Sequence, residues 1–327
     1  MNKKRKFIEI FLLVITALFV LASINVVAQD SNEEIKIVCT NSALADFTSN
    51  IITENSTIDY IMPAGACPAH FDTTPSDIDK IVNADIIISL GWEPWLEDLI
   101  NKSENQEFSE IKCAGLGEWN IPTGAIKYIQ KIRDELIIIL PEYNTTVQQN
   151  VENYMQEINV TAESLKQQIE NQGLKNRKVV CIEWYKDFLN YFGLNVSFYY
   201  GAPEGLSVQD EIDVLNAVSH EDVSAVIDNL QSGTTFGARV ASETGKSHVI
   251  LTNFPNAIPG TDTYLKTIQY NINQTINGIQ TYDYKKGDIQ NLENQIDEII
   301  LQRNASIAIS GILVVLVLIV FIMFKRK

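Results

Sequence analysis

Histidine, cysteine and positive charge are scarce in this chain of 327 residues. It has 3 histidines and 4 cysteines, and it contains no Cys-x-x-Cys pair, no His-Glu-x-x-His motif, no Ser/His/Asp order and no phosphate-binding loop. These absences argue against the enzymes that use such motifs. Lys and Arg number 25 against 41 Asp and Glu, which gives a net charge of −16 and disfavours nucleic acid as a partner. We therefore expect neither an enzyme nor a nucleic-acid-binding protein.

Long apolar runs stand at both ends of the chain. Residues 2–6 are basic, and the apolar stretch after them closes on small residues, which is typical of a signal peptide spanning residues 1–28. Residues 305–324 carry no charge and are followed by Lys-Arg-Lys, so they predict a transmembrane helix with a cytoplasmic tail. We expect a single-pass protein of the cell membrane with an extracellular or periplasmic ectodomain.

The ectodomain should be strongly acidic and open to modification. The two terminal segments each carry a net +3, so their removal leaves −22. Because the chain is expected outside the cytoplasm, its Asn-x-Ser/Thr motifs are candidate glycosylation sites, and its cysteines are disulfide candidates with three possible pairings. No cysteine follows the predicted cleavage site, so we expect the C-terminal helix rather than a lipid to be the anchor. The four cysteines are Cys39, Cys67, Cys113 and Cys181.

Between the terminal segments, apolar runs typical of buried parallel strands alternate with helical stretches. This predicts a first α/β lobe over residues 35–140 and a second over 176–285. Residues 143–172 contain no proline or glycine, so we expect one rigid helix within residues 141–173 to join the lobes. Residues 286–304 are expected to form a helical stalk to the membrane.

Several short motifs follow one another in the first lobe. Residues 63–70 read Pro-Ala-Gly-Ala-Cys-Pro-Ala-His, Pro-Ser-Asp begins at residue 75, Ala-Asp at 84, and Gly-Trp-Glu-Pro-Trp-Leu at 91. In this order they resemble the TroA-like zinc- and manganese-binding proteins of ABC importers, and the resemblance covers most of residues 35–285. It implies a TroA-like periplasmic-binding fold and a monomer that delivers zinc or manganese to an ABC permease.

The resemblance also implies a metal site made from three histidines and one acid. His70 lies within one position of the first of these histidines, and Glu183 stands in the neighbourhood of the third. The second and fourth positions hold Asn120 and Asn253, so the usual set is incomplete. We predict His70, Glu183 and Asp72 as metal ligands. His220 is expected to face solvent and His248 to have a structural role.

Aromatic and amide side chains form a second set of candidates for the cleft. Several follow predicted strands, and ligands of α/β sheets bind at the carboxyl ends of strands. Such walls suit a small organic solute or a metal chelate as well as a bare ion. Some members, Trp95 above all, have an alternative role in the core. The set is Trp92, Trp95, Trp119, Asn120, Trp184, Asn229, Gln231, Ser232 and Asn253.

Three functions remain open from the sequence. The first is a receptor that delivers a divalent metal ion to an ABC importer. The second keeps the fold but binds a metal chelate or a small organic solute. The third is a surface adhesin or sensor with no role in transport.

Overall fold

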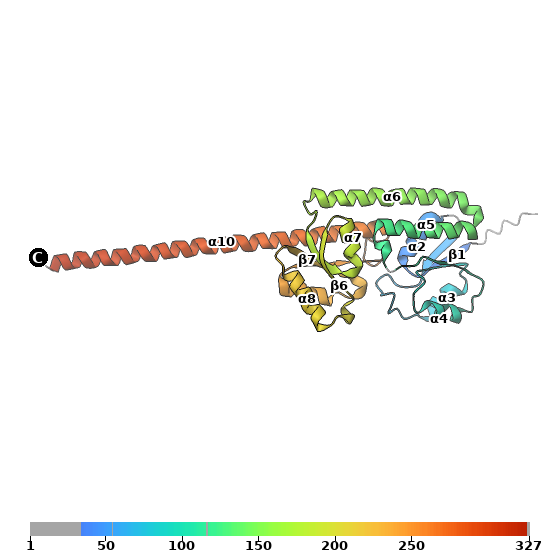
Figure 1. The fold of residues 1–327 in the computed structure, drawn as a ribbon, viewed down its shortest axis with the longest axis horizontal. Helices are drawn as coiled ribbons and strands as arrows, with labels where there is room; N and C mark the ends of the chain where they lie inside the picture. The colour runs from blue at the N-terminus through green and yellow to red at the C-terminus, as the bar shows by residue number, and fades with distance from the viewer. Residues whose placement is uncertain (1–33, 54, 116, 326–327) are drawn as a thin grey trace, which may run out of the picture.

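The computed structural model describes residues 34–53, 55–115 and 117–325, so the predicted signal peptide lies outside the described residues. Two lobes, each with one parallel sheet, lie side by side along a long helix, and a second long helix leaves the molecule as a rod (Figure 1). This confirms the predicted α/β class with two lobes and a long helix running across both.

The first lobe contains a sheet with the strand order β2-β1-β3-β4, and all its strands are parallel. The central strand β3 is an unbroken apolar run until its last residue and is fully buried, as expected where helices cover both faces of a sheet. The elements of this lobe are β1 (Ile35–Cys39), α2 (Ser42–Ile51), β2 (Ser56–Tyr60), α3 (Pro75–Val82), β3 (Ile86–Ser89), α4 (Leu96–Ser103), β4 (Ser109–Lys112), the short η1 (Glu118–Asn120) and α5 (Pro122–Ile139).

The second lobe repeats this topology in the order β6-β5-β7-β8. Its central strand β7 is buried along its whole length and ends in two polar residues, Asp228 and Asn229. The elements are β5 (Lys178–Ile182), η3 (Glu183–Tyr185), α7 (Lys186–Tyr191), β6 (Asn195–Tyr200), η4 (Pro203–Gly205), α8 (Val208–Ser219), β7 (Val223–Asn229), η5 (Leu230–Ser232), α9 (Thr235–Thr244) and β8 (Ser247–Leu251).

Helix α6 (Asn144–Asn171) follows the short η2 (Pro141–Tyr143) and crosses both lobes (Figure 1). Its 28 residues give a length of about 42 Å. Every third or fourth side chain is buried from Val147 to Ile169, and this stripe faces α5, α2 and α10. The helix stops before Gly173, whose positive φ of 68° lets the chain turn away.

Helix α10 (Tyr264–Lys325) is a second element that crosses the lobes, which the sequence analysis did not foresee. Its first turns bury a stripe of isoleucines behind Tyr264, and the ring of Tyr264 packs edge-on against Phe47 of the first lobe at 5.1 Å. The predicted end of the second lobe, the stalk and the apolar segment are one continuous helix, because no proline interrupts it.

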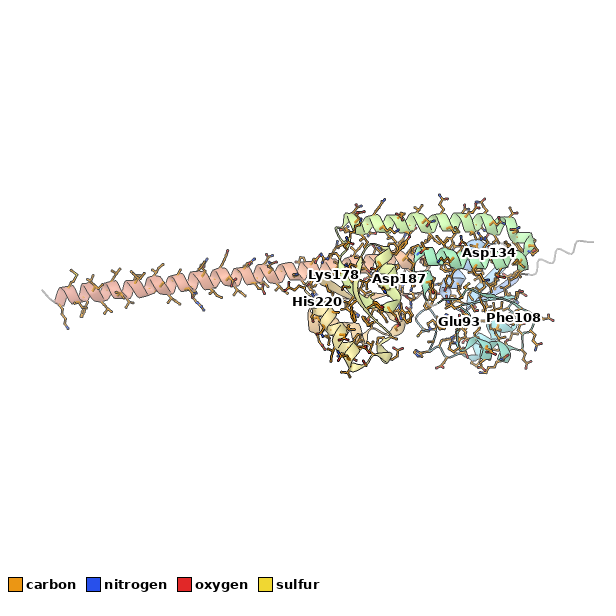
Figure 2. The ribbon with its side chains drawn as sticks, in the orientation of Figure 1. Glu93, Phe108, Asp134, Lys178, Asp187 and His220 are labelled. Carbon is orange, nitrogen blue, oxygen red and sulfur yellow. The ribbon has the colours of Figure 1, made fainter. Side chains whose placement is uncertain are left out.

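Beyond the second lobe, the side chains of α10 stand free on all sides (Figure 2). Its apolar residues there are exposed, as shown by Val317 at 66% and Ile322 at 53%. In the part of the chain that the structure describes, α10 is the one helix long and apolar enough to cross a membrane.

Candidate functional site

A pocket of about 160 Å³ lies in the cleft between the two lobes. Its lining comes from segments that follow strands, so it sits where the carboxyl ends of the strands of both sheets meet. The first lobe contributes Cys67, Pro68, Ala69, Trp92, Gly117 and Trp119, and the second contributes Trp184, Asn229, Gln231, Ser232, Asn253 and Phe254.

Three tryptophans form the walls, and their indole nitrogens are all anchored. Trp119 is 4% exposed, stacks on Phe254 with ring centroids 5.7 Å apart, and donates its Nε1–H to the Asn253 carbonyl at 3.1 Å. The Nε1–H of Trp92 donates to the Gly115 carbonyl at 2.8 Å, and that of Trp184 donates to Ser232 Oγ at 3.2 Å. The rings of Trp92 and Trp184 are partly exposed and offer apolar surface to a ligand, whereas Trp119 is covered by Phe254 and supports the wall from within.

The polar side of the pocket is a chain of amides at the ends of β7 and β8. The buried Asn229 side chain donates to Gln231 Oε1 at 3.1 Å and accepts from the backbone and hydroxyl of Ser232, both at 3.0 Å. Gln231 Oε1 also accepts from the Asn253 backbone N–H at 3.2 Å. The network fixes the Asn229 and Gln231 amides in one orientation, since both ends of these two groups have partners.

Several hydrogen bonds cross directly from one lobe to the other beside the pocket. Asn120 Nδ2 donates to Asn253 Oδ1 at 3.0 Å, and Gln231 Nε2 donates to the Ala64 carbonyl at 2.7 Å. Ser42 Oγ also donates to the Pro255 carbonyl at 2.7 Å. Together with α6 and α10, these bonds hold the lobes in one relative position.

The predicted metal ligands do not meet in this pocket. His70, Asp72 and Glu183 are exposed, and they are not among the described residues that line it. Within residues 34–53, 55–115 and 117–325, no group of three or more His, Cys, Asp or Glu side chains is placed to hold a metal ion. A metal-binding role for these three residues therefore stays a prediction.

The four cysteines are unpaired in this structure, and their use in disulfides stays a prediction. Cys39 pairs with Ile88 of β3, and Cys113 follows β4 on the far side of β3, so the two lie about two strand spacings, or ~9.6 Å, apart. That exceeds the separation a disulfide allows. Cys181 lies in the other sheet. Of the four cysteines, only Cys67 lines the pocket.

The chemistry of the buried cysteines also argues against a role as metal ligands. Burial raises the pKa of the Cys39 and Cys181 thiols well above the ordinary range, and it raises the pKa of Cys113 to about 12. Metals bind the thiolate form, which these environments disfavour.

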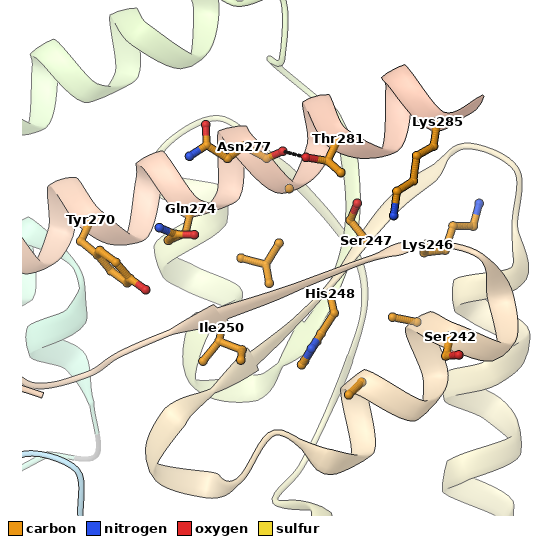
Figure 3. A pocket seen from close by; sticks show the side chains of 14 residues that line it. Ser242, Lys246, Ser247, His248, Ile250, Tyr270, Gln274, Asn277, Thr281 and Lys285 are labelled. Atoms are coloured by element: carbon orange, nitrogen blue, oxygen red, sulfur yellow. Dashed lines mark hydrogen bonds between the residues drawn. The ribbon is translucent and has the colours of Figure 1, made fainter. Parts of the chain in front are cut away.

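A larger hollow of about 570 Å³ lies away from the cleft, along the outer edge of β8 between α9 and α10 (Figure 3). His248 lines it, and its Nε2 lies 2.7 Å from Asp228 Oδ2, while Tyr200 donates to the other oxygen of this buried carboxylate at 2.5 Å. The His248 ring is thus held by a structural carboxylate. His220 is exposed, as predicted.

The sequence predicted most of the residues that line the pocket and missed a few of them. Trp92, Trp119, Trp184, Asn229, Gln231, Ser232 and Asn253 line it, and Asn120 supports it from behind. Trp95 is instead buried against Phe71 and bonds to the Pro68 carbonyl. Phe254, Gly117, Pro68 and Ala69 were missed, although Phe254 comes soon after the end of β8.

Comparison with known proteins agrees with this geometry. A family model described as zinc-uptake complex component A, periplasmic (ZnuA), matches residues 37–278. The chain belongs to the ZnuA family. A manganese-binding lipoprotein, MntA, of Halalkalibacterium halodurans is 25% identical over 276 residues, which cover 76% of this chain and 90% of that protein.

Other relatives and solved structures of the same kind match over shorter stretches or at lower identity. The manganese ABC transporter substrate-binding lipoprotein PsaA of Streptococcus pneumoniae is 26% identical over 193 residues, or 51% of this chain and 62% of that protein. A periplasmic metal-binding protein from Candidatus Liberibacter asiaticus has the same fold, with a TM-score of 0.65 at 20% identity over 75% of this chain and 99% of that one. The ZnuA family is one of substrate-binding receptors rather than enzymes.

Proposed function

We propose that this chain is the membrane-tethered, extracytoplasmic receptor of an ABC importer and that it carries a metal cargo, zinc or manganese, in the cleft between its lobes. The observation that carries the proposal is the pocket at the carboxyl ends of both sheets, in a chain of the ZnuA family. The relatives whose names mention manganese, one as a manganese-binding lipoprotein and one as an ABC transporter substrate-binding lipoprotein, support the choice of cargo.

The C-terminal helix supplies the tether in this proposal. Relatives are named lipoproteins, whereas this sequence has no cysteine just after its predicted signal peptide. The apolar end of α10 is exposed and of membrane-spanning length, and Lys325 begins the basic tail that the positive-inside rule places in the cytoplasm. Such a helix would keep the monomeric receptor beside its permease. All the Asn-x-Ser/Thr asparagines are exposed, but their glycosylation stays a prediction.

The rigid connection between the lobes suggests how cargo would be exchanged. Four direct hydrogen bonds beside the pocket join the lobes, including the one from Trp119 to the Asn253 carbonyl, and each contributes about 1 kcal/mol. Small tilts about α6 and α10 can break them without unfolding either lobe. We therefore expect solution scattering to show little change in overall shape when cargo binds.

The direct test is metal uptake by cells that lack this chain. We expect zinc or manganese uptake to fall under metal limitation and to recover when the full chain is supplied. A chain that stops at Gln302 should be released as soluble protein and should not restore uptake fully. Uptake that does not depend on the chain would contradict the proposal, and continued membrane association of the shortened chain would contradict the tether.

A further inference from the structure

The donor atoms at the cleft do not fit a bare divalent ion. Among the described lining residues there is one Cys and no His, Asp or Glu. Protein sites for zinc supply three or four such ligands, and manganese prefers carboxylates and other hard oxygen or nitrogen donors. The thiol of Cys67 alone cannot complete either set.

The amide oxygens of the pocket are already in use. Asn229 Oδ1 accepts two hydrogen bonds from Ser232, and Gln231 Oε1 accepts one from Asn229 and one from the Asn253 backbone. Asn253 Oδ1 accepts from Asn120. A metal ion would have to displace these bonds to gain the oxygens of Asn229 or Gln231, and the one lone pair left on Asn253 Oδ1 could not complete a coordination set. The network is therefore built to hold the amides for another purpose.

The charge of the pocket leads to the same conclusion. Its described lining carries no acidic or basic side chain. The two carboxylate oxygens of the nearby buried Glu93 accept hydrogen bonds from the backbone N–H groups of Leu90 and Trp92, at 2.9 and 3.1 Å. An ion of charge +2 would therefore lose its water without gaining a counter-charge, which is strongly unfavourable. A ligand with no net charge avoids that cost.

One polar group is left over to orient such a ligand. The Asn253 side chain uses its oxygen for Asn120, and its Nδ2 has no hydrogen-bond partner within the described residues. This amide is only partly buried and belongs to the pocket lining, so it can donate to an oxygen of the ligand. The tryptophan faces around it favour a flat, aromatic ligand.

On the basis of the proposed metal cargo, we propose that the metal enters this cleft as a net-neutral chelate with flat aromatic rings, whose own nitrogen and oxygen atoms bind the metal. The partly exposed rings of Trp92 and Trp184 stack on the chelator, and Asn253 Nδ2 donates to its oxygen. His70, Asp72 and Glu183 take no part in binding.

A binding experiment with two labels tests this on the full chain in detergent. The probes are radioactive zinc alone and radioactive zinc with an excess of tritiated picolinate, which forms a neutral aromatic 2:1 complex. We expect zinc and picolinate to be retained together, with a dissociation constant at least about tenfold below that for zinc alone. Trp184→Ala should weaken retention about fivefold, and Trp184→Phe should restore most of it because the ring face is kept.

Matched variants outside the pocket separate the two kinds of site. His70→Ala and Glu183→Ala should leave retention of both labels unchanged. Zinc retained without picolinate, and lost in either of these variants, would overturn the chelate while leaving the receptor function intact. Retention of picolinate without zinc, or of neither label, would overturn the chelate and count against the metal cargo as well.

Discussion

The sheets of the two lobes have the same strand order, β2-β1-β3-β4 in the first and β6-β5-β7-β8 in the second, yet they give the cleft different chemistry. The first lobe contributes Trp92, Trp119 and a Cys-Pro-Ala segment, which are mostly apolar. The second contributes the amide network around Asn229, with Trp184 and Phe254 at its border. Topology thus places the site, whereas the few residues after each strand decide what it can bind.

Each lobe also buries one aspartate held by a tyrosine, and these pairs differ in the same way. In the first lobe, Asp46 on α2 accepts from Tyr154 at 2.7 Å and from the Tyr264 backbone N–H at 3.1 Å, so it joins α2 to α6 and α10. In the second lobe, Asp228 binds Tyr200 and His248 within one lobe. The first pair connects elements across the molecule, and the second stiffens a single sheet.

The largest difference between the lobes should appear on removing a tryptophan from each. Trp119→Ala should lower the free energy of unfolding by about 4 kcal/mol, because Trp119 is 4% exposed and stacks on Phe254. Trp184 is only half-buried, so Trp184→Ala should cost clearly less. Urea denaturation of the ectodomain measures both. Equal losses would show that the aromatic wall is not built into the first lobe as described.

Each lobe has a glycine at the third position of a helix with no room for a Cβ atom. The atoms that such a Cβ would meet differ between the two lobes. A Cβ at Gly124 would overlap the backbone carbonyl of Glu118, beside Trp119, whereas one at Gly237 would overlap the Asp228 carboxylate. Gly124→Ala should therefore destabilise by about 3 kcal/mol and Gly237→Ala by somewhat less, because a side chain can shift more easily than backbone. Gly65→Ala, with no heavy atom within 4 Å of the new Cβ, is the control and should be nearly neutral. A neutral Gly124→Ala would contradict this packing.

The third prediction uses pH to test the carboxylate of the first lobe. Burial raises the pKa of Asp46 from 3.8 to about 6, against the lowering effect of its hydrogen bonds from Tyr154 and Tyr264. Because the folded pKa is the higher one, protonation favours the folded state. The contribution is full below about pH 3.8 and is lost as the pH rises through about 6.

Asp46→Asn should remove this dependence while keeping an oxygen that accepts the same bonds. Between about pH 4 and pH 7.5, the parent should lose about 2 kcal/mol of stability relative to the variant. Thermal unfolding of both proteins across that range measures the difference. Parallel curves for the two proteins would mean that Asp46 titrates as an ordinary exposed carboxyl.

The sequence predicted the layers of the fold because their signals are local. Apolar runs marked the buried strands, and the absence of proline and glycine marked α6. The second crossing by α10 was missed, since the contact between Tyr264 and Phe47 joins residues far apart in the chain. A stripe of isoleucines shows that a helix is buried, but it does not show against which lobe.

The predictions for the site also differ according to the signal on which they rested. Tryptophans and amides after strands were assigned to the cleft from their position in the topology, and they line the pocket. His70, Asp72 and Glu183 were chosen because the family places ligands near these positions, and in this chain they are exposed. The number of cysteines does not show which of them lie close together: β3 separates Cys39 from Cys113, and pairing of the other cysteines stays a prediction.

The most direct test of the account is the X-ray absorption spectrum of the metal in the loaded receptor, because it reports the atoms bound to the metal. For the loaded receptor, we predict that the nitrogen and oxygen atoms bound to the metal come from the chelator, with no imidazole signature. The His70→Ala variant should give the same spectrum. An imidazole signature that disappears in His70→Ala would contradict the account and would place the metal at His70 instead of between the tryptophans.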